Sequence, residues 1–515
     1  MKKKLFMRAI SLMLAAILCM GLLAPASTAV PAEGTTKLEF TQVDNRAVSA
    51  QITPAEFTQA EDASPYQATD VVRVSILLDG KSTLEAGYST LGIAENASAM
   101  SYRRNLARRQ EAMVDAISAE ALEGEPLDVV WNLTLAANLI SADVAYGDIE
   151  AIQAVLGVKK VILEIRYEPA VYATGEADPN MATSGEMIGT SAAYAAGYTG
   201  AGMRIAVIDT GTDTDHKSFD ADAFAYALAE DEKASGEAYD LLDAAEIGAV
   251  LPQLNAYKRT LQNGKPTAAT PTVEQLYGTA KLPFHYNYVD GDLDVTHDND
   301  DQGEHGSHVA GIATANRYIK TEDGFVSALE AVKVQGVAPD AQLITMKVFG
   351  KKGGAYSSDY MAAVEDAVVL GCDTVNLSLG APYPGFVTAH EDAEEGSAFV
   401  DRIMEELSET GIIMCVAAGN DGNWADQDEA FGLMYTDEAG THRVSSPSTY
   451  ENALSVASVD NVGFVSEYES LFISASGDAF EPAVEKTPNG VQREWKSLDE
   501  AGEGTTYEVV FLGDP

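Results

Sequence analysis

The pattern of apolar and polar positions predicts two regions of different architecture. In the first region, apolar residues alternate with polar ones from Val71 to Leu78, which is typical of a half-buried strand. Apolar residues at 106, 113 and 117 lie on one stripe of a predicted helix. The predicted elements are strands at 71–78, 127–131 and 158–165 and helices at 101–120 and 149–156. This order predicts a small α+β unit with two helices on an antiparallel sheet.

After residue 200, short and almost continuous apolar strands alternate with helical segments. The predicted strands are 204–208, 343–349, 374–378 and 412–417, and the predicted helices are 358–370 and 398–410. This alternation indicates an α/β fold with a parallel sheet and helices on both faces. Residues 212–290 have little apolar periodicity and are interpreted as a large surface insertion. Ligands of such sheets bind at the carboxyl ends of the strands.

Composition narrows the class of protein without naming a function. The 515 residues carry a formal net charge of −46, which disfavours nucleic acid as a partner because phosphate binding needs clustered cations. A hydrophobic content of 46% is typical of a folded protein. Three cysteines exclude a disulfide-built scaffold. Cys372 and Cys415 lie beside or within predicted strands and are expected to be packed thiols.

The N-terminus has the features of a secretory signal peptide. Three lysines and Arg8 precede an apolar stretch at 9–23, and Ser27-Thr28-Ala29 fits a small-x-small cleavage site. About fifteen apolar residues are short for a membrane span, and Leu18 before Cys19 does not fit a lipoprotein signal. We therefore expect export to the cell envelope or medium, with no transmembrane domain in residues 30–515.

Three short segments carry candidate chemistry. Asp209 ends a predicted strand before a tight Thr-Gly turn, and His305 begins the segment His-Gly-Ser-His-Val-Ala-Gly. Asn420 lies on a glycine-flanked turn after another predicted strand. An aspartate that orients a histidine, with an amide that donates to an oxyanion, provides most of the machinery for acyl transfer.

Other chemistries fit the same segments less well. An aspartic-protease dyad needs a second Asp-Thr/Ser-Gly, and the sequence contains none. His305 and His308 could be zinc ligands, but no His-Glu-x-x-His motif is present. The three segments in this order on a parallel sheet favour acyl transfer.

Together the segments resemble the subtilisin family of serine proteases from about 197 to 460, outside the insertion. Further matching blocks are Gly200-Ala201-Gly202, Gly336-Val337-Ala338-Pro339-Asp340-Ala341, Asn376-Leu377-Ser378-Leu379-Gly380 and Val456-Ala457-Ser458-Val459-Asp460. The resemblance implies that Asp209 is the orienting acid, His305 the general base and Asn420 the oxyanion-hole side chain, with His308 at a structural position. It also implies that Ser378, Leu379 and Gly380 line the substrate-binding pocket and that polypeptides are the substrates.

The resemblance also predicts the domain organisation. The preceding α+β unit is similar to the inhibitory propeptide of this family, and its exit strand at 158–165 with residues 169–180 is expected to enter the cleft like a product. We predict a signal peptide at 1–29, a propeptide at 30–172, a partial catalytic domain at 173–464 and the start of an inserted domain at 465–515. The last segment is similar to the protease-associated insert of larger cell-envelope members.

The family's nucleophile has no match on this chain. Its serine block, Gly-Thr-Ser-Met-Ala-x-Pro, is not present after Asn420. Gly189-Thr190-Ser191 resembles the block but precedes Asp209 and lacks the proline, so Thr190 or Ser191 is interpreted as a helix cap. We expect the chain to be a fragment of a secreted serine endopeptidase, inactive alone. The alternatives are a peptide-binding pseudoprotease and a calcium-dependent surface module.

An acidic segment precedes His305. Aspartates at alternate positions could ligate calcium, although an EF-hand loop needs glycine where Val295 stands. These aspartates are Asp290, Asp292, Asp294, Asp298, Asp300 and Asp301. The metal site therefore stays undecided, and no cofactor is required by the predicted chemistry.

Overall fold

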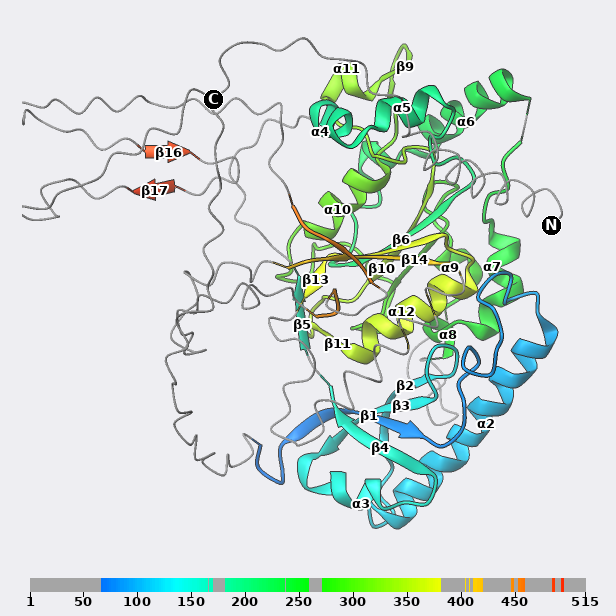
Figure 1. The fold of residues 1–515 in the computed structure, drawn as a ribbon, viewed down its shortest axis with the longest axis vertical. Helices are drawn as coiled ribbons and strands as arrows, with labels where there is room; N and C mark the ends of the chain where they lie inside the picture. The colour runs from blue at the N-terminus through cyan, green and yellow to red at the C-terminus, as the bar shows by residue number, and fades with distance from the viewer. Residues whose placement is uncertain are drawn as a thin grey trace, which may run out of the picture. The chain divides into compact units, whose positions relative to one another are not determined.

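The computed structural model (Figure 1) describes most of the chain between residues 66 and 458. The described residues lie in one compact unit that spans 62–515. They are 66–164, 166–169, 181–236, 238–258, 271–380, 403, 407, 411–419, 446–448, 453–458, 484–486 and 492–494. The predicted signal peptide and most of the predicted helix at 398–410 lie outside them.

The first region forms the predicted α+β unit. Its antiparallel sheet has the strand order β2-β3-β1-β4, with bounds Asp128–Leu133, Leu139–Ala145, Val71–Leu78 and Val158–Leu163. Helices α2 (Ala97–Glu120) and α3 (Ile149–Gln153) contribute the buried Ile117 and Ile152 to the core of this sheet. The α2 helix begins earlier than predicted because the Asn96 side chain accepts hydrogen bonds from two amides of its first turn.

Strand β3 is the element that the apolar pattern does not predict. One of its faces carries Ser141 and Asp143, so the segment does not read as a buried strand. The structure satisfies both through distant partners: Ser141 donates to Glu164 at 2.8 Å, and Arg73 donates to Asp143 at 2.6 Å. Polar residues are tolerated in this central strand because tertiary contacts complete their hydrogen bonds.

The second region forms the predicted parallel sheet. Its six strands have the order β15-β14-β12-β6-β10-β7, and each neighbouring pair is parallel. Their bounds are Leu454–Val456, Ile413–Ala417, Thr374–Leu377, Arg204–Asp209, Gln342–Lys347 and Phe284–Asn287.

Helices cover both faces of this sheet, as predicted. Val207 of β6 and Leu343 of β10 share one buried cluster with Ala310 of α10 (His305–Thr314). Alternate residues of the same strands, such as Ile208, belong to the main core with α12 (Ser357–Val369). Because successive side chains of a strand point to opposite faces, α10 and α12 lie on opposite sides of the sheet.

The interpretation of residues 212–290 as a surface insertion is wrong. Strand β7 is a strand of the six-stranded sheet, paired with β10. The described part of the segment also contains the helices α6 (Ala221–Ser235), α7 (Ala244–Val250), α8 (Asn255–Lys258) and α9 (Val273–Leu276). Leu254, Ala256 and Leu276 are fully buried in the main core. Short helical turns carry few periodic apolar positions, so the pattern gives little sign of this burial.

A third, three-stranded sheet joins the two regions. Strand β5 (Arg166–Pro169) pairs antiparallel with β11 (Ala355–Tyr356) on one side and with β13 (Leu379–Gly380) on the other (Figure 1). The remaining described elements are α4 (Met181–Ile188), α5 (Thr190–Ala195), α11 (Ala328–Val332), β8 (Tyr318–Thr321), β9 (Gly324–Ser327), β16 (Val484–Lys486), β17 (Gln492–Glu494) and the 3-10 turns Tyr146–Asp148, Lys217–Phe219 and Leu251–Gln253.

Two further expectations concern membranes and thiols. Among the residues that the structure describes, no helix is both long and apolar enough to cross a membrane. Cys372 and Cys415 are free thiols, as predicted, and burial raises the pKa of both.

Candidate active site

The structure brings Asp209 and His305 together. Asp209 is the last residue of β6, and His305 is the first residue of α10. The Nδ1 atom of His305 lies 2.7 Å from Oδ1 of Asp209. The carboxylate is 1% exposed and the imidazole 14% exposed. Because a carboxylate only accepts hydrogen bonds, the contact favours the tautomer with the proton on Nδ1 and leaves Nε2 as the basic atom.

Two glycines allow this close approach. Gly211 has φ of +110°, and a Cβ atom on it would lie 2.2 Å from the carbonyl oxygen of Val295. A Cβ atom on Gly306 would lie 2.1 Å from the carbonyl oxygen of Gly211 and 3.1 Å from Cβ of Asp209. The turn after β6 and the start of α10 therefore pack backbone against backbone, which only glycine permits.

The predicted substrate-binding residues lie at the same edge of the sheet. Leu377 ends β12 opposite Ile208 of β6, so Ser378 follows at the level of Asp209. Asn376 donates through its Nδ2 atom to Oγ of Ser378 at 3.0 Å. Leu379 and Gly380 form β13 and already pair with the chain's own strand β5.

The segment that pairs at this edge overlaps the predicted one only at Pro169. Strand β4 stays in the four-stranded sheet, and the residues paired with β13 are Glu168 and Pro169 of β5. Tyr167 of β5 is fully buried, and its ring makes an edge-to-face contact with Tyr360 at a centroid distance of 5.2 Å. Residues 170–180 lie outside the described part of the chain.

The predictions for Asn420 and for the segment at 189–191 are not confirmed. Asn420, the predicted oxyanion-hole residue, lies outside the described residues, three positions after the end of β14. The segment Gly189-Thr190-Ser191 begins a helix before β6, as expected, but its capping residue is Gly189 with φ of +82°. Thr190 and Ser191 therefore lie in the first turn of α5, and the prediction that either caps the helix is wrong.

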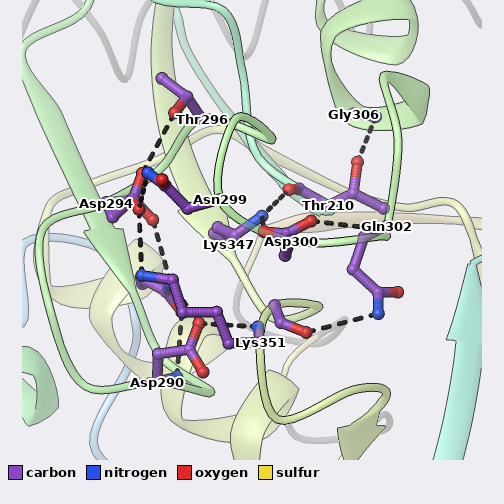
Figure 2. A network of polar contacts seen from close by, with 12 residues as sticks. Thr210, Asp290, Asp294, Thr296, Asn299, Asp300, Gln302, Gly306, Lys347 and Lys351 are labelled. Atoms are coloured by element: carbon purple, nitrogen blue, oxygen red, sulfur yellow. Dashed lines mark hydrogen bonds and ion pairs between the residues drawn. The ribbon is translucent and has the colours of Figure 1, made fainter.

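The acidic segment is tied to the loop after β10, as Figure 2 shows. Asp290 accepts hydrogen bonds from the amides of Lys351 and Lys352 at 3.0 and 3.2 Å. Asp294 accepts from Asn299 at 2.8 Å and from Nζ of Lys351 at 3.1 Å. Desolvation opposes the ionised form of Asp294, but these hydrogen bonds lower its pKa overall. No group of three His, Cys, Asp or Glu side chains is arranged for a metal within the described ranges.

Thr210 and Lys347, next to Asp209 and His305, have no role assigned by the sequence, and Asp300 is named there only as a possible calcium ligand. Thr210 accepts a hydrogen bond from the amide of Gly306 at 2.8 Å, and Lys347 is an almost fully buried lysine paired with Asp300 at 2.8 Å. The sequence does contain one sign of such a role for Lys347. It is a charged residue at the end of the apolar strand β10, and buried lysines are rare unless they are paired.

Similar proteins are found in both sequence and structure comparisons. The PII-type proteinase of Lacticaseibacillus paracasei is 28% identical over 333 residues, which cover 64% of this chain and 14% of that protein. The minor extracellular protease Vpr of Bacillus subtilis is 24% identical over 377 residues, 72% of this chain and 36% of that protein. The C5a peptidase of Streptococcus pyogenes is 26% identical over 261 residues, which cover 50% and 18%. The chain therefore matches less than half the length of each of these relatives.

A solved structure, the epidermin leader peptide processing serine protease from Staphylococcus aureus, is 16% identical with a TM-score of 0.41. It covers 76% of this chain and 71% of its own. The sequence profile described as the Subtilase family matches residues 200–508, which is more than half of the chain. The matched residues include Asp209, His305 and the strands that position them. The chain therefore belongs to the subtilase family of peptidases.

Proposed function

We propose that the chain is the acid–base part of a secreted serine endopeptidase with an Asp-His-Ser triad. The observation that carries the proposal is the 2.7 Å contact between buried Asp209 and Nδ1 of His305 at the carboxyl edge of a parallel sheet. The 515 residues contain no serine block after Asn420, so the proposal requires a nucleophile that they do not supply.

In the proposed reaction, Nε2 of His305 takes the proton of the serine hydroxyl while the serine oxygen attacks the peptide carbonyl carbon. The same imidazolium then gives its proton to the leaving amine, and water repeats the cycle on the acyl-enzyme. Asp209 holds the tautomer and stabilises the imidazolium. Asn420 would donate to the oxyanion of the tetrahedral intermediate.

We further propose that the α+β unit is an intramolecular inhibitor. Strand β5 occupies both neighbouring strand edges at the level of the predicted substrate-binding residues, as an extended peptide substrate would. The unit is also anchored to α12: Trp131 donates to Asp359 at 2.7 Å, and Glu164 accepts from the Ser358 amide at 3.1 Å. A substrate could reach β13 only after β5 leaves.

Export by an N-terminal signal peptide is part of the proposal and rests on residues 1–29. The chemistry needs no cofactor, because protons move only between the serine, His305 and the substrate. Calcium binding by the acidic segment stays a separate prediction, tested by comparing the melting temperature with calcium and with a chelator.

The proposal is tested on the gene product secreted by its native host. We expect hydrolysis of fluorogenic peptides that a serine-directed inhibitor blocks, and no hydrolysis by the 515-residue chain alone. Asp209→Asn should lower kcat by about 10⁴-fold because the amide favours the wrong histidine tautomer, and His305→Ala should abolish turnover. Peptide capture without turnover by the secreted product would instead establish the pseudoprotease.

A further inference from the structure

The start of α10 is not held by its own capping residue. Glu304 occupies the capping position, and its side chain makes no capping hydrogen bond. Residues 298–304 before it contain no helix or strand. The place of His305 therefore depends on contacts that this segment makes with the ends of β6 and β10.

Thr210 provides the first of these contacts. Its hydroxyl accepts from the amide of Gly306 at 2.8 Å and donates to the carbonyl of Gly303 at 3.2 Å, so it bonds the backbone on both sides of His305. Its own amide donates to Oδ1 of Asp209 at 2.6 Å. One residue thus connects the acid to the segment that carries the base.

Lys347 provides the second contact, as Figure 2 shows. It ends β10 directly opposite Asp209 in the strand register, and its side chain is 1% exposed. Its ammonium donates to the carbonyl of Thr210 and forms an ion pair with Oδ2 of Asp300 at 2.8 Å. Asp300 in turn accepts from the amide of Gln302 at 2.9 Å, which leads to His305.

A buried ion pair is an inefficient means of stabilising a fold, because desolvation of both charges offsets their attraction. A hydrophobic pair of similar volume would serve stability equally well. The ion pair instead fixes the position of Asp300 relative to Lys347, which lies 47 positions away in the chain. Any other arrangement of the two segments would leave one of these charges buried without a partner.

We propose that Lys347 is a positioning residue for the general base. Through Asp300 and the carbonyl of Thr210, it holds the segment before α10 so that the imidazole of His305 stays on Asp209 in one tautomer. The catalytic role of Lys347 rests on the proposed function. The contact between His305 and Asp209 that Lys347 holds in place does not require a nucleophile.

The test is an NMR comparison of His305 in the whole 515-residue chain. The ¹⁵N shifts of the two ring nitrogens report the tautomer, and the variant His305→Ala identifies the signals among the seven histidines. Wild type should show a single tautomer with the proton on Nδ1. Lys347→Met should move both shifts toward the average of the two tautomers.

Lys351→Met is the matched control. Lys351 comes from the loop that follows β10 and also contacts aspartates of the acidic segment, but its side chain is 45% exposed. This variant should keep the wild-type shifts. If Lys347→Met does not fold, Asp300→Asn replaces it. This change removes the ion pair of Lys347 but keeps its hydrogen bond to the carbonyl of Thr210, so it should produce the same shift in a milder form.

The double variant Lys347→Met with Asp300→Leu separates positioning from simple stability. We expect it to recover the melting temperature without recovering the single tautomer. Wild-type shifts in Lys347→Met or in the double variant would overturn the proposal. Absence of peptide hydrolysis by the secreted product would count against the proposed function and leave this comparison unaffected.

Discussion

At the scale of single residues, the contact between Asp209 and His305 depends on a glycine, Gly306, which has no side chain. Gly306 follows His305 directly, and its backbone lies against the backbone of Gly211. The local sequence does not reveal this requirement, because a small residue after a histidine is compatible with many local structures. In the fold, the missing side chain of Gly306 allows α10 to approach the turn after β6.

We predict that Gly306→Ala destabilises the protein and separates His305 from Asp209. The added Cβ atom would meet the carbonyl oxygen of Gly211 at 2.1 Å, so one backbone must move. Overpacking of this kind costs about 1–3 kcal/mol. Urea unfolding measures the free-energy change, and the ¹⁵N shifts of His305 report the loss of the contact.

Gly311→Ala is the control on the same helix. A Cβ atom at Gly311 meets nothing within 4 Å, so the gain in helix propensity should stabilise the protein by about 0.5–1 kcal/mol. Equal stability of the two alanine variants would show that Gly306 is not a site of close packing.

At the scale of elements, strand β5 is held by more than its backbone pairing. Tyr167 is fully buried, and its hydroxyl lies 3.5 Å from Oγ of Ser446. The edge-to-face contact with Tyr360 links β5 to α12. A buried aromatic side chain of this kind adds both apolar burial and a ring contact to the backbone pairing of a short strand.

We predict that Tyr167→Ala releases β5 from its pairing with β11 and β13. Truncation of a buried aromatic side chain costs about 3–5 kcal/mol, and the loss should appear as faster hydrogen exchange at the amides of β11 and β13. Exchange in β1 and β3 should not change. Tyr167→Phe keeps the ring contact and should behave like wild type, whereas unchanged protection of β13 in the alanine variant would refute the anchoring role.

At the scale of the whole molecule, buried charges join the α+β unit, residues 253–256 and α12. Glu365 of α12 accepts from the amides of Leu135 and Ala136 at 2.7 and 2.8 Å and pairs with Arg103 of α2 at 3.2 Å. Asp366 accepts from the amides of Asn255 and Ala256 at 2.6 and 2.9 Å and from the hydroxyl of Tyr288 at 2.9 Å.

Asp366 should make the stability of the molecule depend on pH. Burial raises its pKa from 3.8 to about 6, so between these values the folded state binds more protons than the unfolded state. Stability should therefore fall as pH rises from about 4 to 6, by roughly 3 kcal/mol in total. Urea unfolding of wild type and Asp366→Asn across this range isolates the contribution as a difference in slope.

Asp222→Asn is the control for this measurement, since the Asp222 side chain is 67% exposed. It should leave the pH slope unchanged. A wild-type slope in Asp366→Asn would show that Asp366 is ionised to the same extent in both states.

Much of the architecture follows from local pattern. Strands β1, β6, β10 and β12 were predictable because a short apolar run between polar turns is typical of a buried strand. Asp209 and His305 were predictable because each lies in a distinctive local segment. Strand β3 and the burial of residues 254–256 were not, because their polar groups are satisfied by partners far away in the chain.

The candidate site also has features that local sequence predicts and features that it does not. The sequence by itself predicted Asp209 and His305 as the acid and the base and placed Asp209 at the end of a strand, because these features depend on neighbours within a few positions. Only the tertiary structure decided that β5 lies beside β13, and that Lys347, Asp300 and Thr210 surround the pair. Those arrangements depend on long-range packing and on the desolvation of charges, which act between segments that local pattern does not relate.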